Sequence, residues 1–303
     1  MHASNSFYRY APAAHFLVTD EDAADFLQSQ FTNELRPFEE GQCTYGLWLD
    51  VKGKVMADSV VLCEGVERFR MLSERCAGEV IAAHMERHII ADDVQIEQLA
   101  SCFGFEFSGE GVEALGLELP ERGRFVCVEG GVLFSARKRL YNMVIDSEPQ
   151  AEALQAKLIR AGFSQFSEVE RSLARIEAGI PLVPDEIGAA DLPGEGGLEG
   201  NAISFTKGCY LGQEVVARMH NIGKPQRGLF VVQGEGAAPH VPIALYNADS
   251  KQVGELRTAY LKSDSWVGVA ILKTRFAGVG ESLKIKENEA TVINLLGKGH
   301  GND

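Results

Sequence analysis

The sequence predicts an α+β protein that carries a separate small β-barrel or sandwich at its C-terminal end. Strand-like runs and helical patterns follow one another without the regular β-α-β alternation that builds a parallel sheet. Beyond Pro225, short strand-like runs recur at regular spacing with almost no helical pattern. A chain of 303 residues is also long for a single hydrophobic core. We therefore expect a body at residues 1–222, built of two interleaved subdomains, and a β-barrel at residues 223–303.

Two helices are predicted in the first third of the chain, with strands between them. The first begins after Asp20, whose side chain can cap it. Its apolar face is formed by residues at helical spacing, namely Ala23, Phe26, Leu27 and Phe31. A second helix is expected over about residues 76–88, where His84 and His88 share one face. That spacing can bind zinc, but the acid of an H-E-x-x-H arrangement is missing, which disfavours a metal site.

Further strand-like runs precede two more helices, at roughly residues 148–161 and from Ser167 to Ala178. The later helix opens with Ser-Glu-Val-Glu, the pattern of a capping box, and a glycine and a proline follow its end. Residues 184–201 are rich in glycine, proline and acids, which predicts a long loop. Loops of this length inside a compact protein usually have a function.

Charge and composition exclude several classes of protein. The net charge of −14 disfavours direct binding to nucleic acid, because such binding neutralises phosphates with Lys and Arg. No apolar run approaches the roughly 18 residues that a membrane helix needs. The N-terminus lacks the basic start and apolar core of a signal peptide. We therefore expect a cytoplasmic protein with no membrane partner and no direct contact with nucleic acid.

The six cysteines contain no C-x-x-C pair, which argues against a zinc or iron–sulfur site within the chain. We expect no bound metal. Five cysteines lie in apolar or strand-like surroundings and are expected to be buried and inert. These five are Cys43, Cys63, Cys76, Cys102 and Cys127.

Cys209 lies in a different setting, the stretch FTKGCYLGQEVVARMH of residues 205–220. The run LGQEVVARM has helical character, so we expect Cys209 at or just before a helix N-terminus, where the dipole and Lys207 would stabilise a thiolate. Gly208 permits a backbone conformation, or a close approach of a ligand, that a side chain would forbid. A structural cysteine in a tight turn explains the same pattern. His220 would lie about 15 Å away by helix rise, too far to act as a papain-like base.

The run KGCYLGQE, residues 207–214, resembles the K-G-C-Y-x-G-Q-E signature of the YgfZ-type folate-binding family. This family is related to the glycine-cleavage T-protein, an aminomethyltransferase, and to a mitochondrial iron–sulfur assembly factor. Further blocks resemble the family in the same order, so that the resemblance spans nearly the whole chain. They are DFLQSQFTNEL, DVKGKVMADSVVL, RIEAGIP and VGELRTAYLKSDSWVGVAILK.

The resemblance implies a T-protein-like α+β body around a central folate channel, followed by an antiparallel β-barrel. It implies tetrahydrofolate, or a folate derivative, as the cofactor. The implied role is the assembly or repair of iron–sulfur enzymes, including radical enzymes that modify tRNA, and these enzymes would be the partners. Cys209 would then be a functional thiol. The candidate folate contacts are Lys207, Gly208, Tyr210, Gln213, Asn33, Asp58, Arg175 and Glu177.

Two departures from the T-protein pattern keep the activity open. T-proteins carry two acids in the block that corresponds to Ala57-Asp58, whereas this chain has only Asp58 there. T-proteins also lack the cysteine of K-G-C, which this chain has as Cys209. The first alternative is a tetrahydrofolate-dependent aminomethyl or methyl transferase in which Asp58 is the surviving acid. The second is a binding scaffold whose cysteine is structural.

Several candidate residues also have structural explanations. Asp58 alternates with apolar neighbours in a strand, and an inward carboxylate there needs a partner, which indicates a ligand. Arg175 and Glu177 are two apart on a helix and point in different directions, so at most one is expected to face the ligand. Lys207 could instead be a solvated loop residue, and Asn33 a cap of the first helix.

Overall fold

A computed structural model describes residues 5–137, 140–223, 225–285 and 288–296 of the chain. The elements of the body are, in chain order, β1 (Ser6–Tyr10), β2 (Ala14–Thr19), α1 (Ala23–Gln30), β3 (Cys43–Leu49), β4 (Val55–Gly65), β5 (Arg68–Ser73), α2 (Gly78–His88), β6 (Gln95–Gln98), β7 (Phe103–Phe107), α3 (Gly109–Ala114), β8 (Phe125–Val128), β9 (Gly131–Arg137), β10 (Leu140–Ile145), α4 (Glu148–Arg160), β11 (Ser164–Gln165), α5 (Glu168–Glu177), η1 (Pro193–Gly196), α6 (Glu199–Ala202) and α7 (Gln213–Ile222). The remaining elements are β12 (Arg227–Glu235), β13 (Ile243–Tyr246), β14 (Gln252–Lys262), β15 (Ser265–Lys273), η2 (Thr274–Phe276), β16 (Ser282–Ile285) and β17 (Asn288–Leu295).

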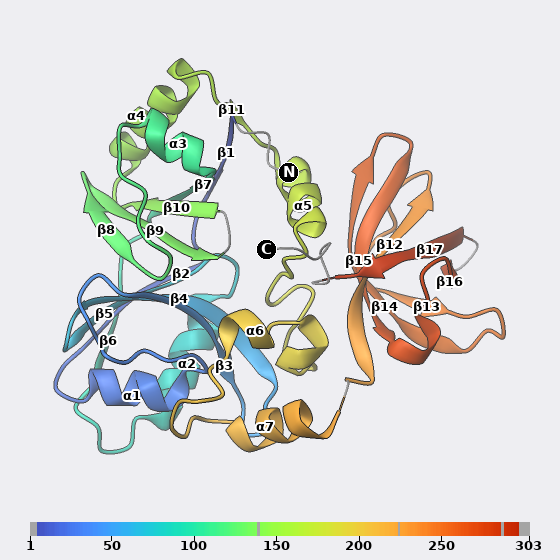
Figure 1. Cartoon of the computed structure of the whole chain (residues 1–303), viewed down its shortest axis with the longest axis horizontal. Helices are drawn as coiled ribbons and strands as arrows, with labels where there is room; N and C mark the ends of the chain where they lie inside the picture. The colour runs from blue at the N-terminus through green and yellow to red at the C-terminus, as the bar shows by residue number, and fades with distance from the viewer. Residues whose placement is uncertain (1–4, 138–139, 224, 286–287, 297–303) are drawn as a thin grey trace.

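The strands form two open sheets and one closed barrel (Figure 1). The first sheet has five strands in the order β3-β4-β5-β2-β6, and the second has six in the order β11-β1-β7-β10-β9-β8. The barrel closes in the order β12-β15-β14-β13-β16-β17, and its strand pairs are antiparallel. The predicted α+β class with a C-terminal antiparallel barrel is confirmed.

The second sheet has one apolar face and one polar face. Its apolar face packs with α3 and α4 into a core that includes Phe105 and Phe107. Because side chains alternate along a strand, Glu106 of the same strand points the other way. Tyr10 on β1 and Asn142 on β10 share that polar face. Strand alternation thus directs several polar side chains from neighbouring strands toward the first sheet.

In the first sheet, the side chains of β4 also alternate between the two faces. Ala57 and Val61 belong to the large core that also includes residues of α1 and α2. Asp58 and Val60 point to the opposite side, toward the second sheet. A smaller apolar core that includes Leu72 joins the two sheets where they face each other. The polar side chains between the sheets therefore lie beside an apolar contact that holds the sheets together.

The barrel packs directly on the body. Leu229 of β12 and both Val269 and Ile271 of β15 belong to the same large core as the residues of the first sheet. The interior of the barrel has its own apolar core. The division of the chain at residue 222 stays a prediction, and residues 297–303 of the predicted barrel lie outside the described residues.

The start of α1 differs from the expected one. α1 begins at Ala23 with Asp22 in the N-cap position, and no side chain caps it. The predicted cap by the side chain of Asp20 is wrong, because Asp20 lies in a turn at φ 89° and only its backbone carbonyl accepts a hydrogen bond from Ala23. The capping box of α5 is confirmed, since Ser167 and the third helical residue exchange hydrogen bonds. None of the helices in the described part of the chain is long and apolar enough to span a bilayer.

The acidic segment predicted as a long loop is partly ordered as η1 and the start of α6. Its acids pair with arginines of the barrel. The Asp191 carboxylate, whose side chain is 1% exposed, accepts from Arg227 at 3.3 Å and also from Arg257. Glu195 accepts two further hydrogen bonds from Arg227, both at 2.8 Å. The segment therefore connects body and barrel, and its structure comes from these ion pairs, which the local sequence does not reveal.

Four of the five cysteines expected to be buried are buried, and Cys127 is exposed. The expectation for Cys127 is wrong because β8 is the edge strand of the second sheet. An edge strand leaves one side of its backbone, and often part of its faces, in contact with solvent.

Candidate functional site

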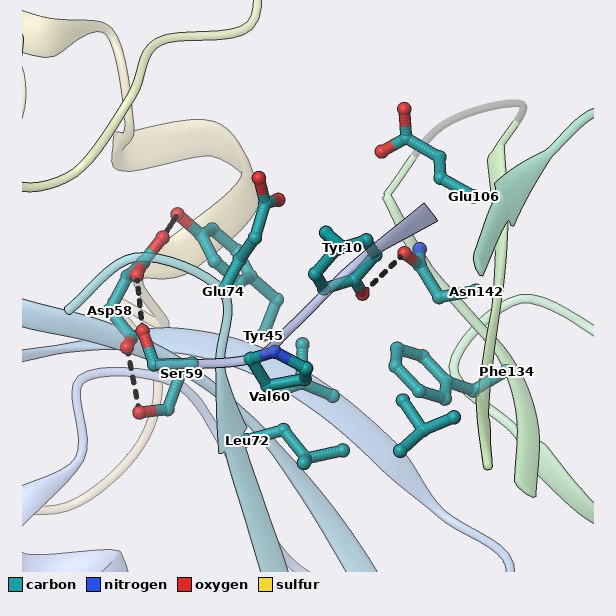
Figure 2. Close-up of a pocket in the computed structure, with 13 residues that line it drawn as sticks. Tyr10, Tyr45, Asp58, Ser59, Val60, Leu72, Glu74, Glu106, Phe134 and Asn142 are labelled. Carbon is teal, nitrogen blue, oxygen red and sulfur yellow. Dashed lines mark hydrogen bonds between the residues drawn. The ribbon is translucent and has the colours of Figure 1, made fainter. Parts of the chain in front are cut away.

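A pocket lies between the two sheets and is lined by residues of both (Figure 2). The space in it that the centres of water molecules can occupy is about 60 Å³. By the same measure one water molecule needs roughly 10–15 Å³, so the pocket has room for several waters or a small organic ring. Its lining residues are Tyr10, Pro12, Tyr45, Asp58, Ser59, Val60, Leu72, Ser73, Glu74, Glu106, Phe134, Asn142 and Val144.

Asp58 on β4 is held in place on the first-sheet wall of this pocket. Its carboxylate accepts hydrogen bonds from Tyr45 Oη at 2.9 Å and from Ser73 Oγ at 3.2 Å. The thiol of Cys76 lies 3.3 Å from Asp58 Oδ1. Burial, and then the nearby Asp58 carboxylate, raise the pKa of Cys76 to about 12, so the thiol stays protonated and donates. These three donors fix the orientation of the carboxylate without a ligand.

The opposite wall is formed by the polar face of the second sheet. Tyr10 Oη donates a hydrogen bond to Asn142 Oδ1 at 3.0 Å. Burial, followed by the negative charges of Glu74 and Glu106, raises the pKa of Tyr10 well above its usual value, so the phenol stays protonated. Figure 2 shows this pair across the pocket from Asp58.

Arg171 on α5 connects both walls. Its guanidinium donates to both carboxylate oxygens of Glu74 at 2.7 Å, and to Glu106 at 3.1 and 3.2 Å. Glu74 follows β5 of the first sheet and Glu106 belongs to β7 of the second, so one buried arginine joins α5 to both sheets. The paired charges offset much of the cost of burying each one.

Lys207 of the KGC run does not line this pocket. Its ammonium is buried and donates to the backbone carbonyl oxygens of Gln28, Phe31 and Asn33 at 2.8, 2.6 and 2.9 Å. Burial lowers the pKa of Lys207 to about 8. All three N–H donors are thus committed to the end of α1. Folate binding by Lys207 stays a prediction that requires these bonds to be exchanged.

Cys209 and Gly208 lie together on the surface of the protein. The expected position of Cys209 at a helix N-terminus is wrong, because α7 begins only at Gln213 with Gly212 in the N-cap position. The intervening Tyr210 is buried, and its hydroxyl has no hydrogen-bond partner in the described part of the chain. The loop therefore anchors one aromatic ring and presents the thiol to solvent.

The remaining predicted residues hold segments of the chain together. Asn33 donates from its amide to the carbonyl oxygens of Tyr45 at 2.9 Å and Asn201 at 3.3 Å. The backbone N–H of Gln213, the first residue of α7, donates to the carbonyl oxygen of Tyr210 at 3.2 Å. Asn33 thus links the end of α1 to β3 and α6, whereas the bond of Gln213 lies within its own loop. A role of either residue in folate binding stays a prediction.

Arg175 and Glu177 point in different directions, as their spacing predicts. Arg175 is buried and pairs with the fully buried Glu186, at 2.7 Å and 3.0 Å. Glu177 has a side chain that is 58% exposed and lies 3.9 Å from Lys262. Arg175 therefore supports the acidic segment, and Glu177 is the one of the two that solvent can reach.

Of the predicted site residues, the pocket includes Asp58 alone. Sequence reasoning missed Tyr10, Glu106 and Asn142 on the opposite wall. The signal was present in the runs SFYRY, FGFEF and LYNMVI, where aromatic or apolar residues alternate with polar ones. Alternation identifies the two faces of each strand, but it does not show which strands will be neighbours.

The described residues contain no group of three or more His, Cys, Asp or Glu side chains that could hold a metal ion. His84 and His88 do lie together on α2, with ring centroids 4.8 Å apart. His88 Nδ1 is 2.7 Å from the backbone carbonyl oxygen of His84. The pair thus makes contacts within its own helix and with the core.

Known proteins resemble the chain in sequence and in structure. A sequence model of the GCVT N-terminal domain family matches residues 9–109. The tRNA-modifying protein YgfZ of Yersinia enterocolitica serotype O:8 / biotype 1B is 26% identical over 291 residues, which cover 92% of this chain and 87% of that protein. The protein of the same name from Yersinia pestis strain Pestoides F is 29% identical over 236 residues, or 75% of this chain and 70% of that protein. This chain is a homologue of the YgfZ proteins.

The relationship to the T-protein is visible in the fold. The glycine cleavage system aminomethyltransferase T from Bartonella henselae superposes with a TM-score of 0.79, over 98% of this chain and 88% of that one, at 14% sequence identity. The predicted T-protein-like fold is confirmed. The segment that matches the GCVT N-terminal domain contains Tyr10, Asp58 and Glu106, and so supplies residues to both walls of the pocket.

Proposed function

We propose that this protein binds tetrahydrofolate in the pocket between the two sheets and takes part in tRNA modification. The observation that carries the proposal is Asp58, a carboxylate that is 6% exposed and oriented by three donors at the pocket wall. A fixed carboxylate can accept hydrogen bonds from the N–H groups of a nitrogen heterocycle. The GCVT-type domain around the pocket and the naming of the YgfZ relatives support a folate-related role.

The finer part of the proposal is an accessory role for iron–sulfur enzymes, including the radical enzymes that modify tRNA. The net charge of −14 favours an effect on tRNA through a client enzyme over direct binding of the nucleic acid. Cys209 is the proposed functional thiol, and its exposure allows a partner to reach it. Gly208 beside it has no atom within 4 Å of the position where a side chain would begin, which leaves space for a close approach.

A second candidate is a tetrahydrofolate-dependent aminomethyl or methyl transferase, and the position of Asp58 favours it. The acid that T-proteins carry next to this position is Ala57 here, and Ala57 points into the core on the other face of the sheet. An acid at that position would therefore not face this pocket. Turnover of an aminomethyl or methyl donor that depends on tetrahydrofolate would distinguish the transferase from the accessory protein.

Calorimetric titration with tetrahydrofolate under reducing conditions tests the binding. We expect micromolar affinity for the wild type and at least tenfold weaker binding for Asp58→Asn, which keeps the shape but loses the charged acceptor. The control is Asp249→Asn, an exposed barrel residue that removes the same charge. Absence of wild-type binding at high micromolar ligand would refute folate binding by the isolated protein.

A cellular experiment tests the thiol. A strain that lacks the gene is complemented with the wild type, Cys209→Ser or Cys127→Ser, and modified tRNA nucleosides are quantified by mass spectrometry. We expect the modification to be lost with Cys209→Ser and kept with Cys127→Ser, because both cysteines are exposed and only one belongs to the KGC run. Equal complementation by both variants would instead support the scaffold whose cysteine is structural.

A further inference from the structure

We propose that one end of the C-terminal barrel binds an unpaired stretch of RNA, with cations at its phosphates and an aromatic ring against one of its bases. This inference rests on the proposed role in tRNA modification. It goes beyond that role, because it gives the protein a direct contact with RNA in addition to its client enzyme.

The negative charge of the chain is unevenly divided. Residues 223–303 contain 10 Lys and Arg residues and 8 Asp and Glu residues, whereas residues 1–222 contain 19 and 35. The net charge of −14 that disfavours nucleic acid therefore comes from the body. A local cluster of cations on the barrel can still attract phosphates, because charges more than a Debye length apart, roughly 10 Å in 0.1 M salt, are largely screened.

Three cations of the barrel gather around Phe276 of η2. The ammonium of Lys251 lies 6.0 Å and the guanidinium of Arg275 lies 4.8 Å from the centre of its ring. Lys273 Nζ donates to the backbone carbonyl oxygen of Gln252, the neighbour of Lys251, at 3.3 Å. Among the described residues, no carboxylate forms an ion pair with any of these three cations. The cluster thus carries positive charge that is available to an anionic partner.

An exposed aromatic ring lies beside this cluster. Tyr246 on β13 is 37% exposed and is paired with Gln252 of β14 on one side and with Lys284 of β16 on the other. These three strands are neighbours in the barrel (Figure 1). Residues paired directly across strands share one face of a sheet, and all three are exposed, so they form a row on the outside of the barrel. The row leads from Lys284 through the ring to Lys251 and η2.

Cations together with an exposed ring fit unpaired RNA better than an acidic protein. The phosphates of a single strand attract cations, and its unstacked bases stack on aromatic side chains, whereas an acidic surface would need the charges alone. Arg275 suits a phosphate because its planar guanidinium can donate two parallel hydrogen bonds. So few cations give weak binding, so a client enzyme that holds the same RNA would complete a stable complex.

The test measures the fluorescence anisotropy of a labelled single-stranded oligoadenylate at several salt concentrations. We expect the wild type to bind with a dissociation constant on the order of 10–100 µM in low salt. The double variant Lys251→Ser/Arg275→Ser should bind at least tenfold more weakly. Its plot of log affinity against log salt should be less steep by about 1.4, since each phosphate contact on a single strand contributes about 0.7. The matched control Lys52→Ser/Arg160→Ser removes the same charge from exposed positions of the body and should change the affinity by less than about twofold.

Tyr246→Ala separates RNA from an acidic partner. It should weaken binding of the oligoadenylate by at least fivefold and leave the salt dependence unchanged, because a lost stacking contact involves no phosphate. Unchanged RNA binding by Tyr246→Ala would refute the inference. Equally tight binding of a polyglutamate peptide would then identify the cluster as a site for an acidic protein.

The result for RNA is independent of the result for folate. Neither Lys251 nor Arg275 lines the pocket, so their double variant should bind tetrahydrofolate as the wild type does. Thermal unfolding establishes that each variant is folded. Absence of RNA binding by the wild type in low salt, or equal losses in the two double variants, would overturn this inference while folate binding stands. A failed folate titration with normal RNA binding would refute only the proposed ligand of the pocket.

Discussion

The ammonium of Lys207 donates a hydrogen bond of 2.6 Å to the backbone carbonyl oxygen of Phe31, just after the end of α1. The same ammonium reaches the carbonyl oxygens of Gln28 and Asn33 at 2.8 and 2.9 Å. The last carbonyl groups of a helix lack partners within the helix, and here one lysine satisfies three of the carbonyls around that end. The cation of the KGC run therefore ties this run to the end of α1, a distant part of the chain.

Replacement of Lys207 by Met should destabilise the protein by about 2–3 kcal/mol, because buried carbonyl groups lose their donor. Urea unfolding measures the change. Lys52→Met, at an exposed position in the turn between β3 and β4, is the control and should change stability by less than about 0.5 kcal/mol. If Lys207→Met were as stable as the wild type, the ammonium would not be a structural tie.

Two glycines of the same run should respond differently to alanine. Gly212 has φ 81°, and an added side chain would begin 2.6 Å from the backbone carbonyl oxygen of Asp50. Gly212→Ala should therefore lower stability by more than about 2 kcal/mol. Gly208→Ala meets no atom within 4 Å and should leave the melting temperature nearly unchanged. A loss of complementation by Gly208→Ala, with normal stability, would show that a ligand or partner approaches there.

His84 should make the protein less stable in acid. Burial, with the nearby charges of His88 and Arg87, lowers the pKa of His84 to about 4, whereas an unfolded histidine titrates near 6.5. Between these two pH values the unfolded chain binds a proton that the folded protein does not. The contribution of His84 to the free energy of unfolding is therefore fully present above about pH 6.5 and is lost as the pH drops toward 4. The loss from this residue is on the order of 3 kcal/mol.

The variant His84→Leu should flatten this dependence. Its unfolding free energy, measured by urea titration at several pH values, should fall less steeply between pH 6.5 and 4 than that of the wild type. Parallel curves for the two proteins would mean that His84 is protonated in the folded state over the same range as in the unfolded chain.

The buried pair of Arg175 and Glu186 predicts a large effect of one single substitution. Arg175→Met leaves the Glu186 carboxylate, which is 0% exposed, without its cation and should cost about 3–5 kcal/mol. The double variant with Glu186→Leu should recover much of this loss, because no buried charge remains unpaired. Glu177→Gln should have little effect on stability, since its side chain is 58% exposed. Calorimetry with tetrahydrofolate on Glu177→Gln then tests its predicted folate contact without the complication of unfolding.

Elements with strong local patterns could be predicted from the sequence. The capping box at Ser167, the helical character of the run LGQEVVARM and the short regular strands of the barrel depend on nearest neighbours along the chain, and each is present. The exposed Cys127 and the start of α7 were not predictable in the same way. The first depends on which strand lies at the sheet edge, and the second on how Tyr210 is buried and Gly212 turns the chain.

The candidate site also contains residues that the sequence could predict and residues that it could not. Asp58 could be selected from the sequence because a carboxylate among alternating apolar residues must find a partner. Tyr10 and Asn142 could not be selected in this way, because their place in the pocket depends on a contact between strands that are more than a hundred residues apart. The structural ties of Lys207 and Arg175 were hidden for the same reason, since their partners are carbonyl groups and a carboxylate of other segments.

By itself the sequence determined the α+β class, the C-terminal barrel and the resemblance to the YgfZ and T-protein families, because periodicity and short motifs are local properties. The tertiary structure alone decided that the pocket has two walls, that Asp58 faces Asn142 across it, and that Cys209 is presented to solvent while Lys207 is buried. Burial and hydrogen-bond partners depend on contacts between distant segments, and these exist only once the sheets have packed.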